Sequence, residues 1–378
     1  MLALRYHPSV GRHVAARASR RAGLGSLELT ELAPPRAPAA DWIQVRPRLS
    51  GICGSDLALF TGRASAHLGA LTSSPFTPGH EVVGELSDGR RVVIEPALGC
   101  TARGLHPACP ECATGRHALC RQVSDGDVSA GLQIGFCRDT GGGWGEALVA
   151  HRSQVHLIPA TLPDEDAVLI EPLACALHAV RLAGPLPGQR LVVIGAGTIG
   201  LLTVAALRAL APEVTVLCVA KHSGQQHEAV RLGADATCVP DRLALEAARV
   251  TRSRRLVDRL GGELLLGGVD CVLDCVGSSA SLQAAVTITR PQGMIVLVGM
   301  PGRVSLDLSL AWQRELRVQG AYGYYHEFAE AITWAGRLGL GRLVDRAFGL
   351  RDFRTALEHA PRAARSGATK TVFDLRAP

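Results

Sequence analysis

The sequence predicts a two-domain α/β protein, and three observations support this fold class. The chain has 378 residues, which is long for one domain and comfortable for two. Continuous apolar runs alternate with helical stretches in the second half, as expected for a parallel sheet covered on both faces. These runs occupy residues 191–194, 214–219, 269–275 and 294–298. The first 160 residues are rich in Gly, Pro, Cys and His and predict irregular β structure.

Composition excludes several classes of protein. No apolar run is long enough to span a bilayer, so we expect no membrane insertion. The net charge is +6, but the arginines are scattered, whereas nucleic-acid binding favours a clustered basic face. Residues 1–27 contain no acidic side chain, a feature that transit peptides share. Residues 2–6 and 13–16, however, look like the opening strands of a folded domain, which disfavours a cleaved targeting segment. We therefore expect a cytoplasmic protein.

A glycine motif predicts a dinucleotide site. The strand expected at residues 190–194 runs straight into Gly195-Ala196-Gly197-Thr198-Ile199-Gly200, and a helix is expected at 201–210. Between a strand and a helix, this spacing indicates dinucleotide binding. Gly195 permits the tight turn, Gly197 lets the backbone approach the pyrophosphate, and Gly200 allows close packing. Thr198 and Ile199 lie in the same turn and are expected to bind the cofactor, next to the free N–H groups at the helix N-terminus that face the phosphates.

The residues after the second strand favour NADP over NAD. An NAD site usually has an acidic residue there, which binds the ribose hydroxyls. Here Lys221, His222 and Ser223 follow the strand, and no carboxylate is present. A 2′-phosphate would be attracted by Lys221, with His222 as a further donor.

Two groups of residues have the chemistry of metal ligands. Cys53, His80, Glu81 and Glu171 offer the thiolate, imidazole and carboxylate donors that zinc takes in catalytic sites. Four further cysteines, at positions 100, 109, 112 and 120, crowd into a short segment, which indicates metal binding in a chain of this size. The remaining cysteines lie in apolar runs and are interpreted as core residues.

These motifs together resemble a known family. Gly-Ile-Cys-Gly-Ser-Asp, Pro-Gly-His-Glu, the cysteine cluster, Glu-Pro-Leu and the glycine motif occur in the order seen in zinc-containing medium-chain dehydrogenases. The chain is similar to the sorbitol, threonine and glucose dehydrogenase branch over nearly its whole length. The resemblance implies a GroES-like catalytic domain at residues 1–160 and 316–378, with a Rossmann domain at 161–315. It also implies hydride transfer between a small alcohol or polyol, or its aldehyde or ketone, and NADP or NAD.

The resemblance assigns roles around the catalytic zinc. Cys53 and His80 correspond to zinc ligands, Glu81 to a third ligand, and Glu171 to a direct or water-mediated fourth. Asp56 resembles the carboxylate that orients the metal-bound imidazole. Ser55 resembles the hydroxyl that takes the substrate proton. Several relatives carry a histidine three residues beyond that serine, where this chain has Ala58, so water or the cofactor ribose would serve the later steps.

The cysteine cluster resembles the family's structural zinc lobe at three of four positions. Cys109, Cys112 and Cys120 match, but the family's first cysteine falls at His106. Either His106 or Cys100 completes the set, and we favour Cys100 because closed four-thiolate sites are common. Such a zinc would stabilise the lobe without taking part in catalysis.

Parts of the sequence pattern also fit other functions, a homo-oligomer and roles for a few further side chains. Two alternatives are a zinc-free quinone or enoyl reductase of the same fold and a non-catalytic nucleotide-binding zinc protein. The strand-like run 304–308 and the segment 316–322 lie where relatives join sheets across a dimer, so we expect a homodimer or homotetramer by analogy. Trp144 and Phe60 fit either a substrate cleft or core packing, and Lys370 is expected at the surface.

Overall fold

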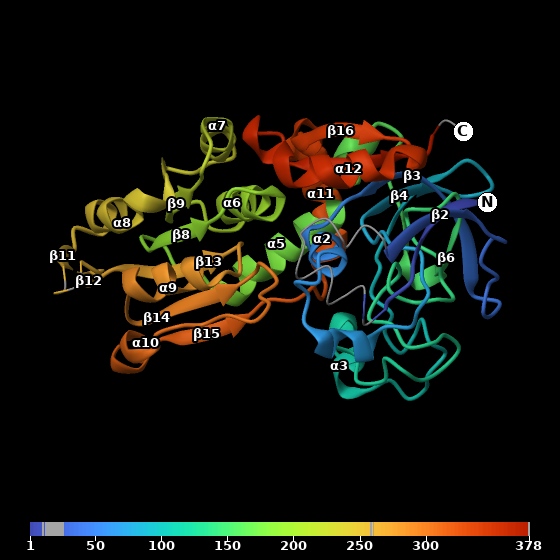
Figure 1. Cartoon of the computed structure of the whole chain (residues 1–378), viewed down its shortest axis with the longest axis horizontal. Coiled ribbons are helices and arrows are strands. Elements are labelled where there is room, and N and C mark those ends of the chain that lie inside the picture. The colour runs from blue at the N-terminus through green and yellow to red at the C-terminus, as the bar shows by residue number, and fades with distance from the viewer. Residues whose placement is uncertain (10, 12–25, 258, 260, 377–378) are drawn as a thin grey trace. The chain divides into compact units, whose positions relative to one another are not determined.

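The structure is a computed structural model that describes residues 1–9, 11, 26–257, 259 and 261–376. The strand expected at residues 13–16 lies outside these ranges. The chain folds as two compact units (Figure 1). Unit 1 comprises Met1–Glu171, Gly323–Arg362 and Lys370–Pro378, and unit 2 comprises Pro172–Tyr322 and Ala363–Thr369. The sequence places these boundaries near residues 160 and 315 and does not reveal the short excursion at 363–369.

Unit 2 contains a six-stranded parallel sheet. Numbered by their order along the chain, its strands lie in the sequence 3-2-1-4-5-6, which is the order of a dinucleotide-binding Rossmann sheet. Across the sheet they are β10 (Ala236–Cys238), β9 (Thr215–Val219), β8 (Arg190–Ile194), β13 (Val269–Asp274), β14 (Thr289–Leu297) and β15 (Arg317–Gly320).

The sequence periodicity explains this sheet. Strands β8 and β9 are buried on both faces because all their residues after the first are apolar. The first residues are Arg190 and Thr215. Helices connect the strands. They are α6 (Thr198–Leu210), α7 (Ser223–Arg231), α8 (Leu243–Thr251), α9 (Ser279–Ile288) and α10 (Ser309–Gln313), and α5 (Ile170–Ala183) precedes β8.

Two features of unit 2 differ from expectation. The run at residues 304–308 forms no strand, and it leads directly into α10. An antiparallel pair, β11 (Arg254–Val257) and β12 (Glu263–Leu266), forms a separate two-stranded sheet that the sequence pattern does not predict.

Unit 1 is built on a largely antiparallel sheet that joins distant parts of the chain. Its ten-residue strand β3 pairs with β6 through its first half and with β4 and β17 through its second half. The sheet runs β16 (Val344–Phe348), β17 (Lys370–Asp374), β3 (Trp42–Gly51), β4 (Val82–Glu85), β5 (Arg91–Ile94) and β7 (Val155–Leu157), with β6 (Leu148–His151) beside β3. A second sheet pairs β1 (Leu2–Tyr6) with β2 (Leu27–Glu31).

Short helices connect these strands. The α-helices of unit 1 are α2 (Gly54–Phe60), α3 (Pro110–Ala113), α4 (Asp164–Ala167), α11 (Glu327–Leu338) and α12 (Phe353–His359). None of the helices in the described ranges combines the length and hydropathy that crossing a bilayer requires.

Aromatic side chains fill the core between β1, α2 and β17. Trp144 is fully buried, and its ring lies 5.6 Å from that of Phe60 and 5.1 Å from that of Phe373. Its indole nitrogen donates to the carbonyl of Gly51 at 3.2 Å. Of the two roles weighed for Trp144 and Phe60, the structure therefore shows core packing.

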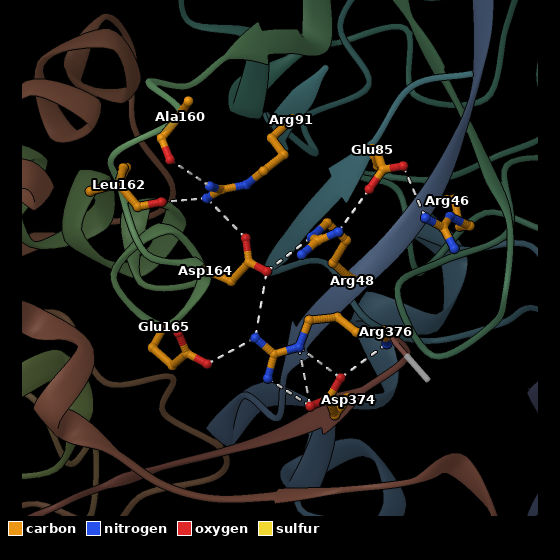
Figure 2. Close-up of polar contacts among 10 residues, drawn as sticks. All are labelled: Arg46, Arg48, Glu85, Arg91, Ala160, Leu162, Asp164, Glu165, Asp374 and Arg376. Atoms are coloured by element: carbon orange, nitrogen blue, oxygen red, sulfur yellow. Dashed lines mark hydrogen bonds and ion pairs between the residues drawn. The ribbon is translucent and has the colours of Figure 1, made fainter. Parts of the chain in front are cut away.

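An ion-pair network holds the start of α4 on the sheet (Figure 2). The Asp164 side chain is only 4% exposed and lies 2.9 Å from the guanidinium groups of both Arg48 and Arg91. Arg376, which follows β17, approaches the same carboxylate at 3.6 Å and pairs with Asp374 at 2.7 Å. Because α4 leads into α5, this network fixes the segment that carries Glu171.

Candidate active site and metal centres

The first candidate metal ligand lies where β3 gives way to α2. Cys53 is the N-cap residue of α2, and Asp56 accepts the backbone N–H of Cys53 at 3.0 Å. This contact satisfies one of the free N–H groups at the start of the helix. The Asp56 carboxylate therefore fixes the turn that presents the Cys53 thiol.

His80 and Glu81 immediately precede β4 and are both buried. The ligand atoms of Cys53, His80 and Glu81 lie within 4.8 Å of one another. Zinc holds such ligands at about 2.0–2.3 Å, so two ligands of one ion lie roughly 3–4 Å apart. The donor types and this convergence fit a zinc ion.

Asp56 also faces His80. Its Oδ1 lies 3.6 Å from Nδ1 of the imidazole, and both atoms are buried without a hydrogen-bond partner among the described residues. This leaves the other ring nitrogen free to bind a metal. Burial by itself lowers the pKa of His80, but the charges of Asp56, Cys53 and Glu171 outweigh it and hold this pKa well above its usual value. Burial raises the pKa of Asp56.

Glu171 lies close to this set but is not part of it. It stands in the first turn of α5 and is 8% exposed. Its charge contributes to the raised pKa of His80 and of Lys370. Its carboxylate is absent from the group of three ligands that the described residues form. Metal binding by Glu171 remains a prediction.

The expectation that Lys370 lies at the surface is wrong. Its side chain is 3% exposed, and its Nζ lies 2.7 Å from Oε1 and 2.5 Å from Oε2 of Glu81. Burial by itself lowers the pKa of Lys370, but the charge of Glu81 outweighs it and raises this pKa. Lys370 begins the last strand of the sheet, next to β3, which brings it to Glu81 across 289 residues.

Ser55 and Ala58 lie on the same helix as Asp56. Ser55 is half-buried near the N-terminus of α2, and Ala58 follows it after nearly one turn. No imidazole is therefore present at position 58. The proton-accepting role of Ser55 remains a prediction.

The second candidate metal centre lies in a lobe between β5 and β6. The sulfur atoms of its four cysteines lie within 4.8 Å of one another. These residues are Cys100, Cys109, Cys112 and Cys120, and they form a buried cluster of their own. His106, the alternative ligand, is exposed and is not part of the group. The structure thus brings Cys100 to the position that the sequence leaves open.

The lobe has the geometry of a four-thiolate site, and the pKa of one of its thiols, Cys109, is lowered. The sulfurs of Cys100 and Cys120 lie 3.6 Å apart, near the roughly 3.8 Å edge of a tetrahedron with zinc–sulfur bonds of about 2.3 Å. Burial raises the pKa of Cys109, but backbone N–H groups of Arg121 and Cys112 outweigh it and lower this pKa to about 7. Burial raises the pKa of Cys120 to about 11.

Arg103 organises this lobe, and sequence reasoning missed it. The side chain is fully buried and donates to backbone carbonyls rather than to a carboxylate. The acceptors include Leu98 at 3.0 Å and Gly131 at 2.6 Å. The chain around Arg103 is rich in glycine and cysteine and offers no periodic signal that would indicate burial.

The glycine motif adopts the expected strand–turn–helix geometry. Gly195 has a φ of +95°, which favours glycine. A Cβ atom on Gly200 would lie 1.7 Å from the carbonyl oxygen of Gly195, so the helix packs directly on the turn. A Cβ on Gly197 would meet no atom within 4 Å, which leaves space in front of the loop. Thr198 begins α6 and Ile199 follows it.

The residues proposed to select the cofactor lie between β9 and α7. Lys221 is exposed, and His222 is the N-cap residue of α7. The side chain of Gln225 accepts the backbone N–H of His222 at 3.3 Å. No carboxylate occupies the position after β9 where an NAD site usually has one.

Comparisons with known proteins agree with this geometry. Residues 39–160 match the family model of the alcohol dehydrogenase GroES-like domain, and residues 198–337 match that of zinc-binding dehydrogenases. The chain is 26% identical to a sorbitol dehydrogenase of Bacillus subtilis, over 85% of this chain and 86% of that one. It is also 26% identical to an L-idonate 5-dehydrogenase of Vitis vinifera, over 88% of each. A solved structure from Sinorhizobium meliloti 1021, bound to NADP, shares 27% identity with a TM-score of 0.73 over 93% of this chain and 96% of that one.

Proposed function

Because the chain belongs to the zinc-containing medium-chain alcohol dehydrogenase family, in its sorbitol-dehydrogenase-like branch, we propose that it oxidises a small polyol with NADP⁺. The products are the corresponding carbonyl compound, NADPH and a proton, and the reverse reduction uses the same groups. The observation that carries this proposal is the convergence of Cys53, His80 and Glu81 within one buried site.

The residues of unit 1 supply the metal chemistry. Cys53, His80 and Glu81 would hold a zinc ion, which supplies a Lewis acid that lowers the pKa of a bound hydroxyl. Asp56 would keep the His80 ring oriented through its Nδ1 atom. Ser55, near the N-terminus of α2, would accept the proton that leaves the substrate hydroxyl. A second zinc ion would stabilise the lobe of four cysteines.

The residues of unit 2 bind the cofactor in this proposal. The loop from Gly195 to Gly200 and the N-terminus of α6 would receive the pyrophosphate. Lys221 and His222 would bind the 2′-phosphate. Support for NADP comes from these residues and from the similar protein solved with NADP. The lobe of four cysteines supports a reducing compartment such as the cytoplasm, because these cysteines would bind zinc as thiolates rather than form disulfides.

An exposed sheet edge supports the proposed homo-oligomer. Strand β15 ends the parallel sheet of unit 2, so one side of its backbone pairs with no strand among the described residues (Figure 1). Large apolar side chains near it are exposed: Trp312 by 83%, Val318 by 56% and Tyr322 by 47%. Pairing with a second copy would cover them. Light scattering of the purified chain should report at least a dimer. Val318→Lys should shift the equilibrium between dimer and monomer toward the monomer.

Activity and metal content test the proposed reaction together. The zinc-loaded chain should oxidise members of a polyol panel with NADP⁺, and Cys53→Ser should lower kcat/KM by at least about a thousandfold while removing one zinc per chain. Cys238→Ala, which removes a buried thiol in unit 2, serves as the control and should keep both metal and activity. Activity that survives Cys53→Ser contradicts the proposed metal site, and a wild-type chain with no zinc at all contradicts it as well.

A further inference from the structure

The short segment Ala363–Thr369 belongs to unit 2, although the chain on either side of it belongs to unit 1. It begins within the 3₁₀ turn η8 (Ala360–Arg365) and leads into β17. Neither family match covers it, since they end at residues 160 and 337. Its contacts with α6 and α7 explain why it belongs to unit 2.

One end of the segment touches the glycine motif. The hydroxyl oxygen of Thr369 lies 3.0 Å from the hydroxyl oxygen of Thr198. Thr198 is the first residue of α6, which directly follows Gly195–Gly197. The segment thus borders the start of the helix that would receive the pyrophosphate.

The middle of the segment touches the start of α7. A Cβ atom on Gly224 would lie 2.5 Å from the carbonyl group of Ser366, and a Cβ atom on Gly367 would lie 2.7 Å from the carbonyl oxygen of Gly224. Gly367 has a φ of +97°, which favours glycine. The two backbones meet with no room for a side chain between them. Gly224 lies in the first turn of α7, three residues after Lys221.

These contacts place the segment beside both halves of the candidate cofactor site. In a Rossmann sheet the pyrophosphate lies at the helix after the first strand, and the adenosine ribose lies at the end of the second strand. These positions correspond to α6 after β8 and to the residues between β9 and α7. The segment Ala363–Thr369 contacts the start of both helices and so forms a wall along this edge.

The charge on this wall is positive. Arg365 is exposed and directly precedes Ser366, whose backbone touches Gly224. Within the described ranges no carboxylate forms an ion pair with Arg365 or with Lys221. Glu228, whose side chain borders Gly367, is paired with Arg231 at 2.7 Å. A dianionic group at the rim of this contact would meet Lys221 from one chain segment and Arg365 from the other.

We propose that the segment Ala363–Thr369 completes the cofactor site and that Arg365 binds the 2′-phosphate of NADP together with Lys221. The inference rests on the proposed function, because it assigns a further residue to the NADP site. Arg365 acts as a specificity-determining residue: it contacts the phosphate that distinguishes NADP from NAD. Its guanidinium suits this group because it donates several hydrogen bonds in one plane.

Binding measurements on the zinc-loaded full chain test this inference. Dissociation constants for NADP⁺, NAD⁺ and 2′-AMP are measured by calorimetry for the wild type, Arg365→Gln, Arg365→Lys and Arg254→Gln. Arg365→Gln should weaken NADP⁺ and 2′-AMP by about 10- to 100-fold and change NAD⁺ by less than about twofold. Arg365→Lys should recover most of the affinity. Arg254→Gln removes an exposed arginine from β11 of the same unit and should match the wild type.

Three outcomes overturn the inference. If the wild type prefers NADP⁺ and Arg365→Gln leaves that preference intact, Arg365 has no role while the proposed function stands. If Arg365→Gln weakens NADP⁺ and NAD⁺ equally, its role is structural and not phosphate recognition. If the wild type prefers NAD⁺ and does not bind 2′-AMP, the proposed cofactor preference and this inference fail together.

Discussion

The ammonium group of Lys370 lies within hydrogen-bond distance of both carboxylate oxygens of Glu81, one residue from the candidate ligand His80. Both side chains are almost completely buried. A Cβ atom on Gly51 would lie 1.8 Å from Oε2 of Glu81, so the neighbouring strand leaves space only for glycine. The pair is thus a fixed part of the site, and its cation offsets the negative charge that the ligands bring together.

In the chain without metal at Cys53, His80 and Glu81, Lys370→Met should destabilise unit 1 strongly. The substitution leaves the Glu81 carboxylate buried beside an apolar side chain, and losing one partner of a buried ion pair costs about 3–5 kcal/mol. Lys370→Arg keeps the charge and should cost less. Urea unfolding measures both free energies. Equal stability of Lys370→Met and the wild type would show that the pair carries no such energy.

The two metal centres should respond separately to cysteine substitutions. Cys109→Ser should lower the zinc content from two ions per chain to one and make the lobe between residues 99 and 120 sensitive to protease, because its fold depends on the metal. Cys53→Ser should remove the other zinc and leave the lobe resistant. Elemental analysis combined with limited proteolysis checks both. A chain that holds one zinc and keeps it in Cys109→Ser contradicts the structural site.

Two glycines of the same motif should behave differently when changed to alanine. Gly200→Ala places a methyl group against the Gly195 carbonyl and should destabilise unit 2 by several kcal/mol. Gly197→Ala meets open space, and its φ of −76° suits alanine, so the fold should be retained. Its methyl group would instead obstruct the pyrophosphate and weaken cofactor binding at least about tenfold. Thermal unfolding and cofactor titration separate the two effects. Normal cofactor affinity in Gly197→Ala would place the pyrophosphate elsewhere.

The network around Arg376 should make the free energy of unfolding depend on pH in the acid range. Burial raises the pKa of Asp374, but hydrogen bonds from Arg376 outweigh it and hold this pKa below its usual value of 3.8. A lowered pKa in the folded state adds stability that is fully present above the unfolded pKa and is lost as pH falls through the folded one. Arg376→Gln should therefore cost about 1 kcal/mol at pH 7, since the pair is partly exposed, and almost nothing near pH 2.

The control for this experiment is Arg90→Gln. Arg90 pairs with Asp88, and both side chains are at least half exposed, so its loss should leave stability nearly unchanged at either pH. Urea unfolding at pH 7 and near pH 2 compares the variants. A cost of Arg376→Gln that is the same at both pH values would mean that Asp374 is not its partner.

Local patterns explain which parts of the fold the sequence predicts. The apolar runs predict β8, β9, β13 and part of β14 because each of these buried strands contains a run of consecutive apolar residues. The cysteine spacing and the glycine motif are also local, and the structure brings both sets together as expected.

Contacts between distant segments explain what the sequence does not predict. The burial of Lys370 depends on a partner 289 residues away, and a single lysine in a polar stretch carries no sign of it. Asp164 is buried because arginines from β3, β5 and the segment after β17 surround it. The excursion at Ala363–Thr369 follows from two backbones meeting at Gly224 and Gly367, which neither periodicity nor spacing reveals.

The place of β17 in the sheet has a consequence for the order of events during synthesis. β17 lies between β16 and β3, and it supplies the cation for Glu81. When a ribosome has made the first half of the chain, β3 still lacks this neighbour and the Glu81 carboxylate has no counter-charge. Unit 1 can reach its final state only after residue 374 has left the exit tunnel, whereas nearly all of unit 2 is complete about fifty residues earlier.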